Sequence, residues 1–96
     1  MIRTEFVAHI AERNPHLFAR DVTAVVGIIL DTMIEALVRG DRVELRGFGV
    51  FEPERRAPRL RRDPRAQIAV EVPEDTAVGF KPSAVMRARL DPIAQD

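Results

Sequence analysis

The sequence predicts a single α+β domain, because two helical apolar patterns are followed by a change to strand-like alternation and then by a short third helix. The length of 96 residues suits one domain. The hydrophobic fraction of 46% is typical of a folded protein rather than a disordered one. The order we expect is helix, long helix, hairpin, an extended pair of arginine-rich strands and a short helix.

The first helix is expected to start at Thr4 and to end at Asn14-Pro15. A threonine oxygen can accept hydrogen bonds from the free amides of a first turn, so Thr4 is the predicted N-cap. The residue before a proline disfavours the helical region, which ends the helix. The apolar residues have helical spacing: Phe6, Val7, Ile10 and Ala11.

The second helix is expected from about Arg20 to Arg39, and Gly40 is the expected terminator. Its apolar residues follow i, i+3, i+4 spacing over five turns: Val22, Val25, Val26, Ile29, Leu30, Met33 and Leu37. Ile28 and Ile34 widen this stripe beyond one face. A helix this apolar in so small a chain is expected to pack against more than its own fold.

After Gly40 the spacing of the apolar residues changes from a helical period to a period of two. Charged residues alternate with apolar ones from Arg42 to Arg46, which predicts a strand with one solvated face. Gly47 and Gly49 flank Phe48 and predict a tight turn into a second strand that begins at Val50. This second strand is predicted to hold Pro53 and Pro58, and prolines belong on edge strands because they donate no amide hydrogen bond.

Strand-like sequence returns after Pro64, from Ile68 through Val72 and on to Phe80. A short final helix is expected from about Ser83 to Leu90, opened by Lys81 or Pro82. Residues from about 55 to 75 have few apolar groups to bury, so they cannot belong to a core. A two-stranded ribbon of this kind is marginal in water unless something else holds it.

The formal net charge of zero is a sum of unlike parts. Residues 1–54 carry a net charge of −3 and residues 66–96 a net charge of −2. Residues 55–65 carry +5, with six arginines: Arg55, Arg56, Arg59, Arg61, Arg62 and Arg65. The planar guanidinium group suits phosphate and groove contacts. Composition alone also allows this run to be a solvated or disordered tail.

Several function classes are disfavoured. The chain has no cysteine, and neither His9 nor His16 stands in a metal-ligand spacing. There is no glycine-rich phosphate loop and no nucleophile motif, so we expect no enzyme, catalytic residue, metal, cofactor or small-molecule substrate. The longest apolar run, residues 25–30, is too short to cross a bilayer, and the first dozen residues lack a signal-peptide core. We therefore expect a soluble, intracellular protein without a membrane partner.

One segment partly matches an RNA-binding signature. Arg46-Gly47-Phe48-Gly49 fits the start of the aromatic strand motif of RNA-recognition domains. The following positions do not fit, and Pro53 stands where an aromatic residue is needed. That fold also needs a strand before its first helix, so Phe48 and Phe51 are predicted to be core residues instead.

The arginine-rich ribbon favours another chemistry. An extended arm of arginines can follow a DNA minor groove, and an apolar wedge at its tip can enter between base pairs and kink the duplex. Pro64 lies at the predicted apex, beside Asp63 and Arg65. Asp-Pro is also a common turn dipeptide, so the residues alone leave open whether Pro64 is a wedge or a plain turn proline.

Motifs at four separate places resemble the HU and integration host factor family of bacterial architectural DNA-binding proteins, and most of all its integration host factor beta subunits. They are Asn14-Pro15-His16-Leu17, then residues 40–51 (GDRVELRGFGVF), then Arg56-Ala57-Pro58-Arg59 with Arg62-Asp63-Pro64-Arg65, and finally Phe80-Lys81-Pro82. The resemblance extends from Met1 to about Leu90.

This resemblance implies an intertwined dimer, either a homodimer or a heterodimer with a related alpha-type subunit. Residues 1–96 would form one domain, with a helical dimerisation part at about 1–40 and a sheet with its arm at about 41–81. The three-stranded antiparallel sheet would extend into a β-ribbon arm at about 55–75, and the C-terminal helix would cover about 82–90. The partner would be the minor groove of double-stranded DNA in the bacterial nucleoid, in the cytoplasm.

The resemblance also implies a set of site residues. Pro64 would intercalate. The DNA-binding residues would be Thr4, Arg42, Glu44, Arg46, Arg55, Arg56, Arg59, Arg61, Arg62, Pro64, Arg65, Lys81 and Ser83, with Glu44 orienting Arg46. The dimer core would contain Val25, Val26, Ile29, Met33, Leu37, Phe48, Phe51 and Phe80. Such proteins bend DNA in nucleoid organisation, recombination and transcription regulation.

The tip departs from the family's usual pattern. Asp63 stands where an asparagine is usual, Gln67 where a glycine eases the turn, and Arg61 where a glycine is common. The partly acidic tip motivates an alternative function, that of a divergent paralogue that acts mainly by protein pairing or filament assembly and binds DNA weakly.

Overall fold

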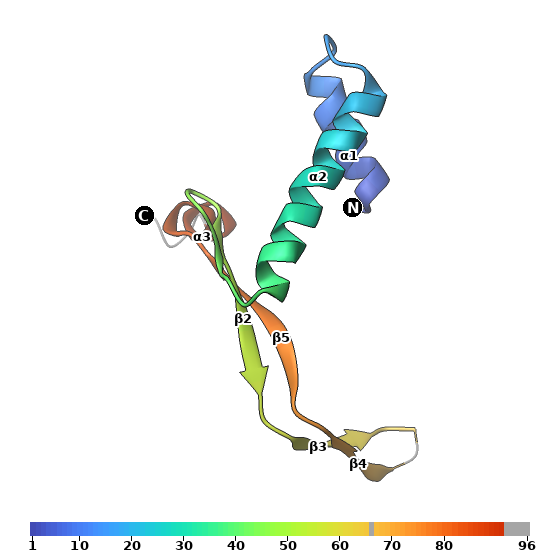
Figure 1. Ribbon diagram of the computed structural model, residues 1–96, viewed down its shortest axis with the longest axis vertical. Helices are drawn as coiled ribbons and strands as arrows, with labels where there is room; N and C mark the ends of the chain where they lie inside the picture. Colours follow the sequence, from blue (N-terminus) through green and yellow to red (C-terminus); the bar gives the residue numbers. More distant parts are fainter. Residues whose placement is uncertain (66, 92–96) are drawn as a thin grey trace. The chain divides into compact units, whose positions relative to one another are not determined.

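The computed structural model describes residues 1–65 and 67–91, and it has the predicted α+β composition (Figure 1). The chain divides into two compact units, residues 1–35 and residues 36–96. Within the described residues, no helix is long and apolar enough to cross a membrane.

The first unit consists of α1 (Arg3–Arg13) and most of α2 (Ala19–Val38). Arg3 of α1 comes close to Gly27 of α2, where an added Cβ would lie 3.1 Å from its Nη2 atom. The buried apolar side chains are Val22 and Val26, both on α2. Much of the predicted apolar stripe is open to solvent in the single chain, since Val25 is 54% exposed and Ile29 is 52% exposed.

The ends of these helices agree with the sequence in part. Helix α1 ends before Pro15, and α2 ends at Val38. Gly40 follows it with a φ of +92°, and the amides of Gly40 and Asp41 donate to the carbonyls of Leu37 and Ala36. The prediction that Thr4 caps α1 is wrong. The N-cap is Ile2, without a side-chain hydrogen bond, and Thr4 already lies in the first turn, inside the helix that it was expected to cap.

The second unit contains a three-stranded antiparallel sheet with the order β1-β2-β5. These strands are β1 (Val43–Leu45), β2 (Gly49–Arg56) and β5 (Asp75–Pro82). The predicted turn between the first two strands is confirmed: Gly47 has a φ of +78°, and the amide of Phe48 donates to the carbonyl of Leu45 at 2.9 Å. Gly49 is buried, and a Cβ there would lie 2.6 Å from the carbonyl oxygen of Lys81.

Pro53 lies on the middle strand rather than on an edge strand, but at a place where β2 has only one neighbour. Strand β1 pairs with β2 no further than Phe51, whereas Pro53 is opposite Val78 of β5. The missing amide hydrogen therefore costs the sheet no bond to β1. Pro58 lies after the end of β2, contrary to the prediction that it belongs to that strand.

A second, two-stranded antiparallel sheet pairs β3 (Arg59–Asp63) with β4 (Ile68–Val72). Its register is the same as that of β2 with β5, so the two ladders form one ribbon that is interrupted at residues 57–58 and 73–74. Pro58 faces Pro73 in this register, and neither can donate a ladder hydrogen bond, which explains the interruption. The predicted strand from Ile68 to Phe80 is therefore two strands.

Helix α3 (Ala84–Leu90) begins one residue later than expected. Ser83 is its N-cap, and its Oγ accepts the amide hydrogen of Met86 at 3.1 Å. The prediction that Lys81 or Pro82 opens this helix is wrong, because both still pair with β2 as part of β5. The amide of Ser83 donates to the carbonyl of Phe48 at 2.8 Å, which holds the start of α3 beside the turn between β1 and β2.

Candidate nucleic-acid interface

The arm, residues 55–75, carries six arginines. Those at its base have acidic partners, and those at its tip have none among the described residues. At the base, the register places Arg56 opposite Asp75 and Arg55 opposite Thr76. Arg56 donates to both carboxylate oxygens of Asp75, from Nε at 3.0 Å and from Nη2 at 2.8 Å. Arg59 donates to the same carboxylate at 3.4 Å.

Arg55 completes this cluster at the base. It forms an ion pair with Glu74 and donates to the hydroxyl of Thr76 at 3.0 Å. The hydrogen bond from Arg56, helped by the one from Arg59, lowers the pKa of Asp75 below its ordinary value of 3.8. All of these groups are accessible to water, so each ion pair is weak, but together they tie the two strands on either side of the proline break.

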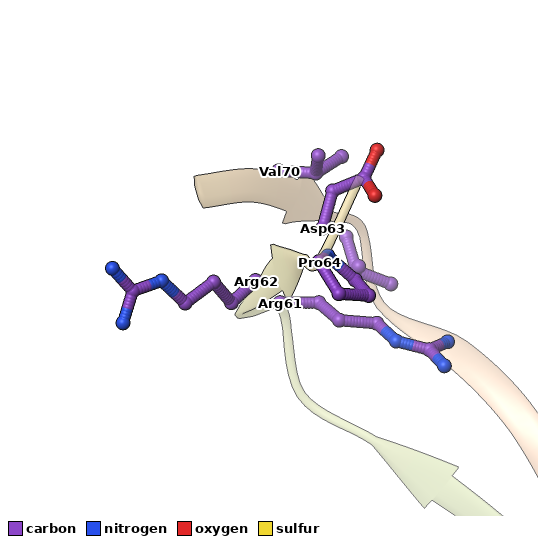
Figure 2. A pocket seen from close by; sticks show the side chains of 6 residues that line it. Arg61, Arg62, Asp63, Pro64 and Val70 are labelled. Carbon is purple, nitrogen blue, oxygen red and sulfur yellow. The ribbon is translucent and has the colours of Figure 1, made fainter. Parts of the chain in front are cut away.

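At the tip, the register brings no acid opposite the arginines. Arg61 lies opposite Val70, and Arg62 lies opposite Ala69. Within residues 1–65 and 67–91, no ion pair involves Arg61, Arg62 or Arg65. Figure 2 shows the guanidinium groups of Arg61 and Arg62 extending in different directions from β3. These cations are therefore available to an external anion.

Pro64 lies in the turn between β3 and β4, in a hollow on the tip (Figure 2). The residues that line this hollow are Arg61, Arg62, Asp63, Pro64, Val70 and Val72. Exposed apolar side chains continue along β4, where Ile68 is 60% exposed and Val70 is 43% exposed. The tip thus combines an exposed proline and apolar surface with unpaired cations.

A second group of predicted site residues meets beside the three-stranded sheet. Glu44, Arg46, Lys81 and Ser83 line one open hollow between the β1–β2 turn and the start of α3. Among the described residues the ion pair of Glu44 is with Arg42, so the orienting of Arg46 by Glu44 stays a prediction. Arg46 follows the end of β1 and lies in the turn itself.

Thr4 belongs to the other unit, residues 1–35, where it lies in the first turn of α1. The three aromatic residues predicted for the core do form a cluster, with ring centroids 4.7 Å apart for Phe51 and Phe80 and 5.5 Å apart for Phe48 and Phe80. In the single chain, this cluster remains partly open: Phe48 is 45% exposed and Phe80 is 40% exposed.

The sequence interpretation missed the acids of the returning strand, Glu74 and Asp75. The sequence could have indicated this pairing. If the two strands of the arm are paired in register about the turn, Asp75 lies opposite Arg56, as it does in the structure. Gln67, noted above as standing where a glycine eases the turn, has a φ of +54°, a left-handed conformation that residues other than glycine seldom adopt. Among the described residues, no group of three or more histidines, aspartates or glutamates could hold a metal ion.

Comparison with known proteins agrees with this architecture. The family model described as bacterial DNA-binding protein matches residues 1–91. A structure of HU from Anabaena, solved as a cocrystal with DNA, is similar with a TM-score of 0.83 and 33% sequence identity, over 96% of this chain and 99% of that one. HU from Thermotoga maritima has the same fold, with a TM-score of 0.64 and 23% identity over 94% of this chain and 98% of that one. The chain therefore belongs to the bacterial DNA-binding protein family, the family of HU and integration host factor.

Proposed function

We propose that this chain is an architectural DNA-binding protein that binds the minor groove as a dimer and bends the duplex. The observation that carries the proposal is the tip of the arm, where Pro64 lies among three arginines that have no acidic partner within the described residues. The Anabaena relative was crystallised with DNA, which supports the same class of ligand.

In this proposal, Arg61, Arg62 and Arg65 bind phosphates or the groove, and Pro64 enters between base pairs. The minor groove attracts arginine side chains, and apolar wedges unstack base steps and kink the helix. A bend of this kind costs on the order of 1–10 kcal/mol, depending on the stiffness of the sequence. Wrapping two arms around the duplex offsets this cost, because the bent DNA then binds a larger protein surface. Arg55, Arg56 and Arg59 hold the base of the arm and meet DNA only secondarily.

A second DNA-binding surface is proposed beside the sheet. Arg46 and Lys81 share one hollow and would meet the backbone of DNA that passes the body, with Arg42, Glu44 and Ser83 around them. Thr4 would lie near a further phosphate. Among members of the family, the chain would then most resemble the beta subunit of integration host factor in this role of Arg46.

The proposed dimer would cover the apolar surface that a single chain leaves open. Its core would contain Val25, Val26, Ile29, Met33, Leu37, Phe48, Phe51 and Phe80. The partner would be a second copy of this chain or a related alpha-type subunit, and residues 1–96 would act as one domain. We place the protein in the bacterial nucleoid, where DNA bending serves compaction, recombination and transcription.

The test is a salt series of binding to a duplex of about 35 base pairs that carries a fluorophore at each end, so that affinity and end-to-end distance are measured together. The purified chain should sediment as a dimer, bring the ends together, and lose affinity steeply as salt rises. A stable dimer without salt-sensitive DNA binding would contradict the proposal and favour the alternative of protein pairing.

A further inference from the structure

The turn at the tip is built by Asp63. Its Oδ1 atom accepts the amide hydrogen of Arg65 at 2.9 Å, and its carbonyl oxygen accepts that of Gln67 at 2.8 Å. A side chain that bonds to the backbone two residues ahead forms an Asx turn, which fixes the local chain direction. Asp63 therefore holds Pro64 at the apex, and its carboxylate stays beside the proposed wedge.

One oxygen of this carboxylate has no role in the turn. Within residues 1–65 and 67–91, Oδ2 of Asp63 takes part in no hydrogen bond or ion pair. The residue opposite Asp63 in the ladder is the apolar Ile68. Figure 2 shows the carboxylate directed away from the guanidinium groups of Arg61 and Arg62. The tip thus presents an acceptor next to Pro64.

The minor groove offers different partners to such an acceptor, depending on the base pair. A·T pairs present only acceptors there, whereas a G·C pair adds one donor, the N2 amino group of guanine. Stretches of A·T pairs also have a narrower groove with a more negative potential. An ionised carboxylate can accept but not donate, so it gains a hydrogen bond from guanine and is repelled by A·T pairs.

We propose that Asp63 is a specificity-determining residue that favours a G·C pair at the base step entered by Pro64. The inference rests on the proposed function, because it needs the tip to enter the minor groove. An asparagine at the same place would keep the acceptor for the turn, but its amide could also donate and would serve A·T pairs as well. The single carboxylate therefore makes the tip selective without any additional binding surface.

The experiment compares two duplexes of the same sequence, one with guanine and one with inosine in place of every guanine. Inosine lacks the N2 amino group and keeps the major-groove edge of guanine, so only the minor-groove donor is removed. Binding and end-to-end distance are measured on both duplexes for the wild type, Asp63→Asn and Glu71→Gln. Glu71 lies on the same arm opposite Leu60, so its substitution removes one negative charge on the other face of the ribbon.

The quantity of interest is the ratio of affinities for the guanine and inosine duplexes. Effects of inosine on duplex stiffness are common to all variants and cancel when these ratios are compared. We expect the ratio to be about tenfold higher for the wild type than for Asp63→Asn, as one hydrogen bond to a charged group predicts. Glu71→Gln should bind both duplexes more tightly and keep the wild-type ratio. Asp63→Ser, which can also form the turn, should behave like Asp63→Asn.

Equal ratios for the wild type and both Asp63 variants, with bending retained, would overturn the role of Asp63 and leave the proposed function intact. A ratio that falls as much in Glu71→Gln would also overturn it, because general charge would then explain the preference. If the wild type bends neither duplex, the proposed function fails and the inference fails with it.

Discussion

The base and the tip of the arm contain the same type of side chain in opposite situations. At the base, Arg56 faces Asp75 across the ribbon and shares it with Arg59. At the tip, Arg61 and Arg62 face Val70 and Ala69 and have no acidic partner among the described residues. A cation that already has a partner must exchange it to bind phosphate, whereas an unpaired cation only releases its counterions. The register of one hairpin thus separates arginines that hold the arm from arginines that we propose to meet DNA.

The largest expected effect comes from neutralising the tip. The triple variant Arg61→Gln, Arg62→Gln, Arg65→Gln should lose about 100-fold or more in affinity at low salt. The slope of log affinity against log salt should flatten by about 0.9 for each phosphate that the variant no longer neutralises. Both quantities are read from the same salt series.

The matched control is the base triple Arg55→Gln, Arg56→Gln, Arg59→Gln, which removes the same charge from the same arm. It should lose less affinity and change the slope less, because these arginines exchange internal partners for phosphate. If the two triple variants lose the same affinity and show the same salt slope, the arginines of the base and of the tip contribute equally to DNA binding, which contradicts the distinction.

The next effect in size concerns the wedge. Pro64→Ala removes the ring that would enter between base pairs but keeps every arginine, so the bend should decrease more than the affinity. The distance between duplex ends at saturating protein measures this directly. An unchanged distance would show that Pro64 is a plain turn proline.

A smaller effect is expected at the base. Asp75→Asn removes the shared carboxylate of Arg56 and Arg59, and amide hydrogen exchange near residues 56 and 75 should become faster as the strands separate. With two cations freed, DNA affinity should rise a few-fold and the salt slope should steepen by about one to two units. A fall in affinity would mean that order at the base matters more than free charge.

The lowered pKa of Asp75 gives this cluster a pH dependence of known sign. Since the folded state binds the proton less tightly, the stabilisation is complete above the ordinary pKa of 3.8 and is lost as pH falls through the lower, folded value. Exchange protection at the arm base should therefore be constant from neutral pH down to about pH 5 and decrease only in stronger acid. Loss of protection near pH 6 would show that a titratable group other than Asp75 stabilises the base of the arm.

The smallest effect concerns the turn. Gln67→Gly should relieve the cost of a left-handed conformation, about 1 kcal/mol before the greater freedom of the unfolded chain is subtracted. Hydrogen exchange at positions 67 and 68 should slow by a few-fold, while the unfolding of the helical unit should not change. Faster exchange would show that the glutamine side chain stabilises the turn.

The fold was largely predictable because its signals are local. The apolar spacing of α2, the glycine at its end and the alternation from Arg42 to Arg46 each depend on neighbouring residues. The errors occurred at boundaries: Thr4 lies two residues after the N-cap of α1, and Pro82 still belongs to β5. The interruption of the ribbon depends on Pro58 meeting Pro73, which is a matter of pairing rather than of local propensity.

The sequence was enough to name candidate site residues, but it did not show which of their charges pair with one another. Counting along the chain gives residues 55–65 a net charge of +5, yet the returning strand brings Glu74 and Asp75 beside Arg55 and Arg56. In the same way, Glu44 is two residues from both Arg42 and Arg46, and only the structure shows that Arg42 is its partner. Such choices depend on side-chain direction, which spacing alone does not give.

The most direct test of the account is a fluorescence scan with 2-aminopurine placed in turn at each adenine of a bound duplex in which every G·C pair adjoins an A·T pair. Its emission rises when the base is unstacked, so it reports where a wedge enters. We predict bright positions with the wild type and with the base triple, and their loss with Pro64→Ala. No bright position in the wild type, or bright positions that persist in Pro64→Ala, would contradict the claim that the tip of the arm opens the base stack.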